Sequence, residues 1–407
     1  MPESKESRPS STGNSPVRFD VVNEPLVREA MLIEASAGTG KTYSLERLVA
    51  RLVVEKAVPI QSLLIMTFTR AATAELSARI RKILMKYRDA LRKNKSPEES
   101  RFEAGDYDET DRKLLAGWLC LPEEEISKCI DRLSEAVNRF DDAAVFTIHS
   151  FCQRMLVDYV FSRGGSFEMT LGNDDAQVAQ ALDELLRTAY AVRKDDKAFI
   201  QELQQWKGWE EKLGRLKSQS MADIDLDVLA AQEESPISDA MKTWIQETFR
   251  AVPDRIRALK QVSNTLTFDD LLLELWLALR DGGNRSLADN IRQRFKAVLV
   301  DEFQDTDPIQ FNILKKLFLD TASSPGTDRP YVFFVGDPKQ AIYGFRSAEL
   351  ETYLRARQEI NHIRMLDTNF RSTPALVQAV NTFFCQKGRQ SRFLNDAIQY
   401  DPIDANP

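Results

Sequence analysis

One segment limits the possible folds more than any other: a short apolar stretch, Met31–Ile33, runs into a glycine-rich loop that ends in a lysine. The loop comprises Ala35, Ser36, Ala37, Gly38, Thr39, Gly40, Lys41 and Thr42. Between a strand and a helix, such a loop lets backbone N–H groups surround phosphate oxygens at the positive end of the helix dipole. We interpret it as a phosphate-binding loop (P-loop), although Ala35 replaces the usual first glycine. A glycine-rich turn before an ordinary helix is the alternative.

Three further apolar runs have the pattern of buried parallel strands: Leu63–Met66, Ala297–Val300 and Tyr331–Val335. The four runs end in EASAGTGKT, TFTRAA, DEFQD and GDPKQ. Ligands of open α/β sheets lie beyond the carboxyl ends of the strands, so these ends are where we expect chemistry. Helical periodicity dominates elsewhere, for example in 71–91, 177–192 and 268–279. The pattern predicts an α/β fold built on a parallel sheet.

The composition is that of ordinary globular proteins, with 29% charged and 43% hydrophobic residues over 407 positions, enough for two or three domains. No run approaches the roughly 20 apolar residues that span a bilayer. Residues 1–17 are rich in serine and proline and lack the apolar core of a secretory signal, so we expect a disordered tail and a cytoplasmic protein with no membrane partner. The cysteines lack a metal-binding spacing and are expected to be reduced: Cys120, Cys129, Cys152 and Cys385.

A basic strip extends from Arg70 to Lys95, although the net charge of the chain is −7. Lysine and arginine in this strip are opposed only by Glu75 and Asp89. A local strip of this kind binds phosphates even in an acidic protein. A solvated helix face explains it equally well.

Two adjacent carboxylates, Asp301 and Glu302, follow the apolar run Ala297–Val300. Carboxylates at the end of a buried strand are costly to desolvate unless a cation lies near them. Asp301 suits the binding of Mg²⁺ through water, and Glu302 suits the acceptance of a proton from a water that attacks a γ-phosphate. Taken alone, the pair is also explained as a helix cap or a solvated loop.

Two later side chains complete a candidate nucleotide site. Gln340 follows the run Tyr331–Val335 and is placed to sense a γ-phosphate with its amide. Arg371 offers a planar guanidinium, which suits phosphate oxygens as charge develops on them. Lys41 would reach the β- and γ-phosphates, and the hydroxyl of Thr42 would bind Mg²⁺.

The order of these motifs resembles that of the superfamily 1 helicases of the UvrD, Rep and RecB group. The matching segments are EASAGTGKT, TFTRAATAEL, FTIHSF, TFDDLLLEL, VLVDEFQDTDPIQ, VGDPKQAIYGFR and LDTNFRS. With Glu34 ahead of the loop, IEASAGTGKT is more similar to the N-terminal helicase part of the RecB branch than to UvrD or AddA. The resemblance runs from about residue 20 to about residue 400.

The resemblance implies a RecA-like P-loop NTPase fold interrupted by a helical insertion. The implied domains are 1A at 18–160 and 261–355, the insertion 1B at 161–260, and the truncated beginning of domain 2A at 356–407. Strand signals on both sides of 161–260, and none within it, agree with this division. The adenine-reading glutamine of the family is replaced by Asn23-Glu-Pro-Leu. The motifs that complete domain 2A are absent before Pro407, so we expect the isolated chain to unwind DNA weakly.

The resemblance also implies a role for each site residue, with ATP and Mg²⁺ as cofactors. Catalysis falls to Glu302, Gln340 and Arg371, metal binding to Thr42 and Asp301, and adenine packing to Phe370. The implied DNA contacts are Phe68, Thr69, Arg70, His149, Tyr343, Phe345 and Arg346. Aromatic side chains that stack on bases tolerate any sequence and contribute about 1–3 kcal/mol per base. A core position for the aromatics, and helix capping by His149, are the alternatives.

The implied function is an ATP-dependent 3′-to-5′ DNA helicase, a helicase–nuclease subunit of recombinational repair. Its implied partners are single-stranded DNA, duplex ends, and RecC- and RecD-like subunits. Two alternatives stay open. A P-loop ATPase that does not act on DNA predicts no stimulation of ATP turnover by single-stranded DNA. A truncated or degenerate helicase that serves as a scaffold predicts nucleotide binding without turnover.

Overall fold

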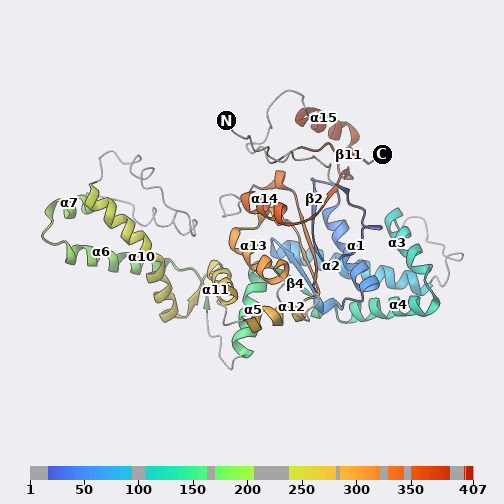
Figure 1. Cartoon of the computed structure of the whole chain (residues 1–407), viewed down its shortest axis with the longest axis horizontal. Coiled ribbons are helices and arrows are strands. Elements are labelled where there is room, and N and C mark those ends of the chain that lie inside the picture. The colour runs from blue at the N-terminus through green and yellow to red at the C-terminus, as the bar shows by residue number, and fades with distance from the viewer. Residues whose placement is uncertain are drawn as a thin grey trace, which may run out of the picture. The chain divides into compact units, whose positions relative to one another are not determined.

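Apolar strands occur on both sides of a long helical stretch, and the structure separates accordingly into two units (Figure 1). The computed structural model describes residues 17–93, 106–162, 170–205, 238–280, 285–320, 329–342, 350–385, 398 and 400–406. The α/β unit comprises the described residues of Met1–Ile148, Ala288–Ile342 and Ala348–Pro407. The helical unit comprises those of His149–Leu287.

Among the described residues, parallel strands form one sheet in the α/β unit, in the order β1-β9-β2-β8-β7-β3-β4. Their bounds are β1 Val17–Arg18, β2 Ala30–Ala35, β3 Leu63–Thr67, β4 Ala144–Thr147, β7 Ala297–Val300, β8 Tyr331–Gly336 and β9 His362–Leu366. Strands β3, β7 and β8 are buried along their whole length, as expected for a sheet covered on both faces. Parallel pairing aligns the carboxyl ends, so that Glu34 lies beside Gly336 and Met66 beside Val300.

The four apolar runs of the sequence are the strands β2, β3, β7 and β8, which confirms the predicted α/β fold. The sequence patterns missed β1, β4 and β9. Strand β9 reads HIRML and has no fully buried residue, because a strand pairs through its backbone without needing a continuous apolar run.

Two predicted boundaries need correction at the level of single strands. Strand β9 pairs with β2 although it lies beyond the boundary at residue 356, so residues up to Leu366 belong to the sheet of the α/β unit. Val17, which was assigned to the disordered tail, pairs with Arg364 in β1. The rest of the predicted tail lies outside the described residues.

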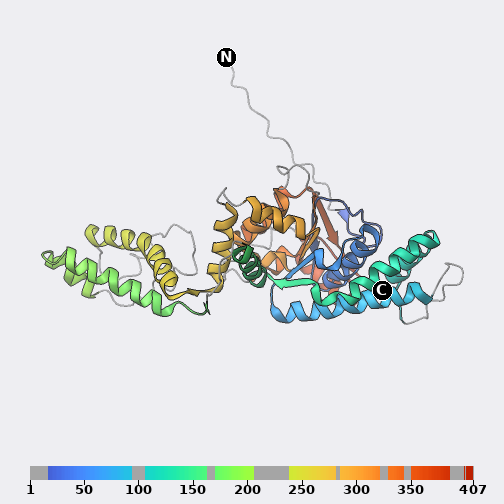
Figure 2. The same ribbon diagram turned by 90° about the horizontal axis from the view of Figure 1, so that it is seen from below.

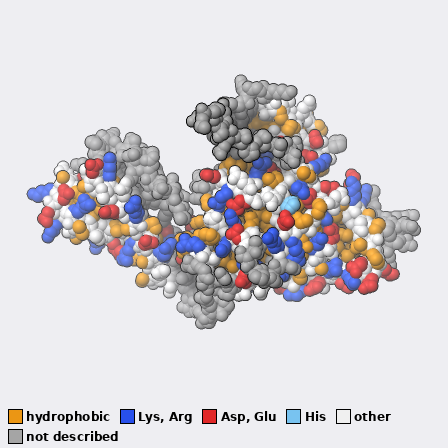
Figure 3. All heavy atoms as spheres, in the orientation of Figure 1, with side chains coloured by type: hydrophobic (Ala, Val, Ile, Leu, Met, Phe, Trp, Pro, Cys, Tyr) orange, Lys and Arg blue, Asp and Glu red, His pale blue; other side chains and the backbone are white. Residues whose placement is uncertain are grey.

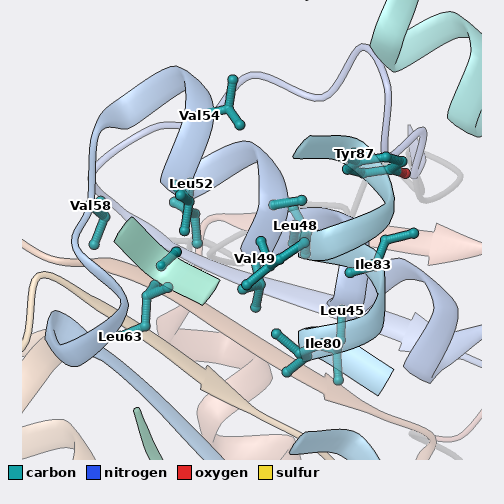
Figure 4. Packing of buried hydrophobic residues seen from close by; sticks show 14 of the residues in the cluster. Leu45, Leu48, Val49, Leu52, Val54, Val58, Leu63, Ile80, Ile83 and Tyr87 are labelled. Atoms are coloured by element: carbon teal, nitrogen blue, oxygen red, sulfur yellow. The ribbon is translucent and has the colours of Figure 1, made fainter. Parts of the chain in front are cut away.

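Helix α1, Lys41–Lys56, begins directly after the glycine-rich loop and is buried over most of its length. Leu48 and Leu52 of α1 are fully buried, and Figure 4 shows the side chains of α1 meeting those of Ile80 and Ile83 from α2, Arg70–Lys93. Each fully buried leucine or isoleucine contributes about 1.5–3 kcal/mol. This packing fixes the start of α1, and with it the loop, against the sheet.

The other helices of the α/β unit are α3 Glu109–Leu119, α4 Glu123–Asn138, α13 Pro308–Leu314, α14 Leu350–Glu359 and α15 Pro374–Phe384, together with most of α12 Arg285–Arg294. Helix α5, Ile148–Ser162, belongs to the helical unit from His149 onward. Helices α1 and α2 lie on one side of the sheet, and α13 and α14 on the other (Figures 1 and 2). Short strands β10, Thr368–Asn369, and β11, Asp404–Ala405, pair after β9.

Much of the basic strip of the sequence is neutralised by acidic neighbours. Arg79 pairs with Glu46 at 2.5 Å, and Lys86 pairs with the fully buried Asp111 at 2.6 Å. Burial alone would raise the pKa of Asp111, but hydrogen bonds from Lys86 and Tyr87 outweigh it and hold that pKa below its ordinary value. Positive and negative side chains are also interspersed on the face drawn in Figure 3. These pairs favour the structural interpretation of the strip.

The helical unit contains α6 Asp175–Val192, α7 Lys197–Gln205, α10 Asp239–Ser263 and α11 Phe268–Arg280. Its core includes Phe199, Met241 and Ile245, which come from α7 and α10. Two short strands, β5 Thr170–Leu171 and β6 Thr265–Leu266, pair in parallel. Strand β5 falls within 161–260, where no strand was expected, because two-residue strands leave no sequence pattern.

Some sequence features lie outside the described residues or leave no structural trace. Residues 94–105 and 206–237 lie outside the described residues. Cys129 and Cys152 are buried, and Cys120 and Cys385 are exposed. In the described part of the chain, no helix combines the length and hydrophobicity that crossing a bilayer requires.

Candidate nucleotide site

The glycine-rich loop joins β2 to α1 with two residues in the left-handed region of backbone space. Gly38 has a φ of 79°, and Gly40, the N-cap of α1, has a φ of 88°. Residues with a Cβ rarely adopt such backbone angles. The hydroxyl of Thr39 donates to the carbonyl of Ser36 at 2.8 Å and closes the turn. The start of α1 has no side-chain cap among the described residues. Its first N–H groups are therefore available to an anion.

Lys41 lies at the centre of the site. Its Nζ is 3.2 Å from Oε2 of Glu302 and donates to Oε1 of Gln340 at 3.3 Å. Gln340 follows β8, which neighbours β2 in the sheet, and Glu302 follows β7, the strand on the other side of β8. The structure thus brings together the lysine, the carboxylate and the amide that the sequence singled out.

Asp301 and Glu302 leave the end of β7 in a tight turn. The backbone N–H of Asp301 donates to the carbonyl of Met66, and Glu302 adopts a left-handed φ of 51°. Burial, followed by repulsion from Glu302, raises the pKa of Asp301 to about 6. A cation close to such a buried carboxylate stabilises its charged form.

The donor set fits a nucleotide-bound Mg²⁺ better than a protein-enclosed metal. Among the described residues, no group of three or more His, Cys, Asp or Glu side chains forms a metal site. Mg²⁺ typically takes one or two carboxylates and completes its shell with phosphates and water. Asp301 and the hydroxyl of Thr42 would be the protein's contribution.

The segment Asn369–Ser372 packs directly on the loop. The amide of Asn369 donates to the carbonyl of Ala37 at 2.9 Å, and the backbone N–H of Phe370 donates to the carbonyl of Gly38 at 2.9 Å. A Cβ on Gly38 would lie 2.9 Å from Cβ of Arg371. Arg371 is exposed, and the ring of Phe370 is 64% exposed. Both side chains are therefore accessible beside the loop.

The candidate DNA residues are less closely grouped. Phe68 is half-buried after β3, whereas Thr69 and Arg70 are exposed at the start of α2. The hydroxyl of Thr69 accepts from the backbone N–H of Ala72 at 3.1 Å and so caps this helix. Tyr343, Phe345 and Arg346 lie outside the described residues.

His149 belongs to the helical unit. Its ring meets that of Phe268 edge-on at 5.9 Å, and burial lowers its pKa. The structural environment of His149 is therefore an aromatic contact within that unit. It neither requires nor opposes a DNA contact.

Sequence reasoning missed polar residues that bind the site together. Gln304 is 3% exposed and Asp337 1% exposed, and both contact residues of the site. Their signal was present, since both lie in the motifs DEFQD and GDPKQ at strand ends. Glu34 was noted only as a marker of resemblance, yet its carboxylate accepts from Tyr353 and Arg357. Glu24, in the place of the adenine-reading glutamine, instead pairs with Arg364 at 2.8 Å.

A parallel sheet with a left-handed glycine loop, a lysine at the helix start and carboxylates at the carboxyl end of another strand defines a P-loop nucleotide-binding α/β protein. A family model, the UvrD/REP helicase N-terminal domain, matches residues 19–361. The chain belongs to this helicase family. The parallel sheet, seven-stranded in the described part of the chain, is consistent with the RecA-like fold that the resemblance implied.

Similar proteins agree with this assignment. The chain is 30% identical to the RecBCD enzyme subunit RecB of Escherichia coli (strain K12), over 95% of this chain and 40% of that protein. It is 31% identical to RecB of Mycobacterium tuberculosis (strain CDC 1551 / Oshkosh), over 90% of this chain and 30% of that protein. RecB of Haemophilus influenzae is 26% identical over 93% of this chain. The predicted resemblance to the RecB branch is confirmed, and the chain spans less than half the length of these relatives.

Proposed function

We propose that the chain binds ATP with Mg²⁺ at the carboxyl edge of its sheet and hydrolyses it. The observation that carries this proposal is the position of Lys41, whose Nζ lies within 3.3 Å of both Glu302 and Gln340, although Gln340 is 299 positions away in the sequence. Lys41 and Thr42 would hold the triphosphate and the metal, and Asp301 the metal. Bound Mg²⁺ neutralises charge on the phosphates as the terminal one is transferred to water.

Four side chains of the site have distinct proposed tasks. Glu302 takes a proton from the attacking water, a role that a carboxylate next to a lysine performs in its charged form. Gln340 senses the γ-phosphate from the end of β8. Arg371 contacts the same phosphate, and the exposed ring of Phe370 packs on adenine. The contacts of Asn369 and Phe370 with the loop support these last two tasks.

We infer further that ATP turnover drives 3′-to-5′ translocation on single-stranded DNA, as part of a helicase–nuclease in recombinational repair. Family membership and the RecB relatives support a DNA helicase. Duplex ends, RecC- and RecD-like subunits and a cytoplasmic location belong to the same proposal. The DNA contacts would come from Phe68, Thr69 and Arg70, with His149, Tyr343, Phe345 and Arg346 in addition. The division into 1A, 1B and 2A, with 1A extended to Leu366, also belongs to this proposal.

A steady-state ATPase assay on the chain, with and without single-stranded DNA, tests the proposal. We expect DNA to stimulate turnover, and Glu302→Gln to lower it about 100-fold while Mg²⁺–nucleotide binding persists. Turnover that ignores DNA would favour an ATPase with another partner. Nucleotide binding without turnover, unchanged by Glu302→Gln, would favour a scaffold. A single-turnover unwinding assay then measures strand separation by this chain, which we expect to be weak.

A further inference from the structure

Gln304 is a buried side chain with no task in the proposed chemistry. It lies in a short 3₁₀ turn, Phe303–Asp305, that follows Glu302 directly, and it is 3% exposed. Its Nε2 donates to Oε2 of Glu302 at 2.8 Å, and its Oε1 accepts from the backbone N–H of Asp337 at 3.0 Å. The amide thus joins the end of β7 to the end of β8.

The two partners fix the orientation of this amide. A carboxylate oxygen only accepts and a backbone N–H only donates, so reversing the amide would oppose like groups at both ends. The mismatch is costly at Asp337, which is 1% exposed, because its N–H has no water as a substitute partner. Gln304 therefore holds the carboxylate of Glu302 in one direction relative to Asp337.

The contacts of Gln304 belong to a closed ring of hydrogen bonds. From Asp337 the ring continues to Nε2 of Gln340 at 2.7 Å, from Oε1 of Gln340 to Lys41 at 3.3 Å, and from Lys41 back to Glu302 at 3.2 Å. Each ring member except Lys41 comes from the motifs after β7 and β8. The ring therefore contains two routes between Gln340 and Glu302, one through Lys41 and one through Asp337 and Gln304.

Gly336 makes room for this arrangement. A Cβ at Gly336 would lie 2.8 Å from Oε1 of Gln304 and 3.1 Å from its backbone nitrogen. Any larger residue would displace Gln304 from the ring. The glycine at the end of β8 is thus explained by the close approach of the Gln304 side chain and of the backbone of Phe303 and Gln304.

We propose that Gln304 is a positioning residue that aims Glu302 and couples it to the γ-phosphate sensor Gln340. This inference rests on the proposed function. A bound triphosphate attracts Nζ of Lys41 and weakens the route through the lysine. The route through Asp337 and Gln304 then remains as the protein's own link between the sensor and the carboxylate.

Gln304→Leu removes both hydrogen bonds at similar volume, and Gln61→Leu is a matched control. Gln61 precedes β3 at the opposite edge of the sheet, and its Oε1 has no hydrogen-bond partner among the described residues. We expect Gln304→Leu to slow single-turnover ATP hydrolysis about tenfold or more, with the Kd for Mg²⁺–ADP changed less than about twofold. Gln61→Leu should leave both quantities unchanged.

Two further comparisons separate positioning from a general structural role. In the Glu302→Gln background, Gln304→Leu should cause no further loss of turnover, because the group it aims is already disabled. The preference for Mg²⁺–ATPγS over Mg²⁺–ADP, measured by binding alone, should fall in Gln304→Leu. Gly336→Ala should displace the amide of Gln304 and so also slow ATP hydrolysis and lower the preference for Mg²⁺–ATPγS.

Each outcome bears on a different claim. If Gln304→Leu hydrolyses ATP like the wild type and keeps its preference for the triphosphate, the inference is overturned and the proposed function stands. Equal losses of ADP affinity and hydrolysis would also overturn it, since they indicate general damage to the site. A wild-type chain that binds no nucleotide overturns the proposed function itself, and the inference with it.

Discussion

Lys41 of the α/β unit is partly buried and Lys260 of the helical unit is buried, and both are paired with acidic side chains, yet their surroundings differ. Lys41 follows a loop with two left-handed glycines, and its partners come from the ends of other strands. Lys260 lies near the end of a helix, α10, and is 2.7 Å from Asp174 and 2.7 Å from Asp270. Asp270 also accepts from the backbone N–H and hydroxyl of Thr267 at the start of α11.

The difference teaches that burial and pairing alone do not identify a functional lysine. The carboxylate of Asp270 is held by local contacts at a helix start, which residues in such positions make in many proteins. The partners of Lys41 are a partly exposed carboxylate and an amide, which leave the ammonium able to exchange them for phosphate oxygens. Position at the carboxyl edge of the sheet, next to an uncapped helix start, is what marks the functional lysine.

The largest effect that would sharpen this comparison is expected from Lys41→Met. Loss of the ammonium removes the main charge opposite the phosphates, so ATP turnover should fall about 1,000-fold. Because the side chain of Glu302 is 38% exposed, the free energy of unfolding should change by less than about 1 kcal/mol. Turnover assays and chemical denaturation measure the two quantities. If Lys41→Met lowered the free energy of unfolding but kept the turnover of each folded molecule, Lys41 would be a structural lysine like Lys260.

Lys260→Met should produce the opposite profile. It leaves the carboxylates of Asp174 and Asp270 without their cation and with little solvent. Removing one partner of a buried ion pair typically lowers the free energy of unfolding by about 3 kcal/mol. Nucleotide affinity should stay within about twofold of the wild type, because the loss is confined to the helical unit. Denaturation followed by fluorescence, together with nucleotide titration, checks both expectations. A large loss of nucleotide affinity would show that the two lysines are not separable.

The contrast also indicates which parts were predictable from sequence. The strands β2, β3, β7 and β8 are apolar runs in a sheet covered on both faces, and such runs stand out in the amino-acid sequence itself. The convergence of Lys41, Glu302 and Gln340 followed from one rule, that parallel strands align their carboxyl ends. The strand β9 was not predictable, because the half-buried HIRML obtains its stability from backbone pairing with β2.

The polar ring was hidden for a different reason. Gln304 and Asp337 matter through the direction in which their side chains point, and a sequence does not state that direction. Likewise the pairing of Arg79 and Lys86 with acidic residues depends on how α1, α2 and α3 pack. Motif residues that supply charge were predictable, whereas residues that orient those charges become recognisable only in the folded chain.

A smaller effect is expected from Gly38→Ala, with Gly172→Ala in the helical unit as its control. Alanine at Gly38 is strained by the φ of 79° and would place its Cβ 2.9 Å from Nδ2 of Asn369 and Cβ of Arg371. We expect nucleotide affinity to fall about tenfold, since strain of about 1–2 kcal/mol distorts the loop. At Gly172 the added Cβ would meet only Thr265, at an ordinary 3.7 Å. Equal effects at the two glycines would contradict the strain argument.

The smallest effect concerns buried carboxylates, which differ between the two regions in whether they are paired. Asp305, near Lys41, is 7% exposed, and its Oδ1 has no hydrogen-bond partner among the described residues. Burial, followed by repulsion from Glu302, raises its pKa to about 6, from 3.8. The folded state therefore holds a proton that the unfolded state releases, and stability is lost as the pH rises from about 4 to about 6.

Asp305→Asn should remove that loss and raise the free energy of unfolding by about 1 kcal/mol at pH 7. The gain should shrink as the pH falls toward 5, because the wild-type carboxyl then carries its own proton. Asp174→Asn, which weakens the ion pair with Lys260, should instead lower stability at pH 7. Urea denaturation of both variants between pH 5 and pH 8 gives the comparison. A gain from Asp305→Asn that does not vary with pH would mean that the raised pKa is not its cause. If Asp305→Asn raises the free energy of unfolding and Asp174→Asn lowers it, the carboxyl edge of the sheet retains a poorly paired charge at the expense of stability.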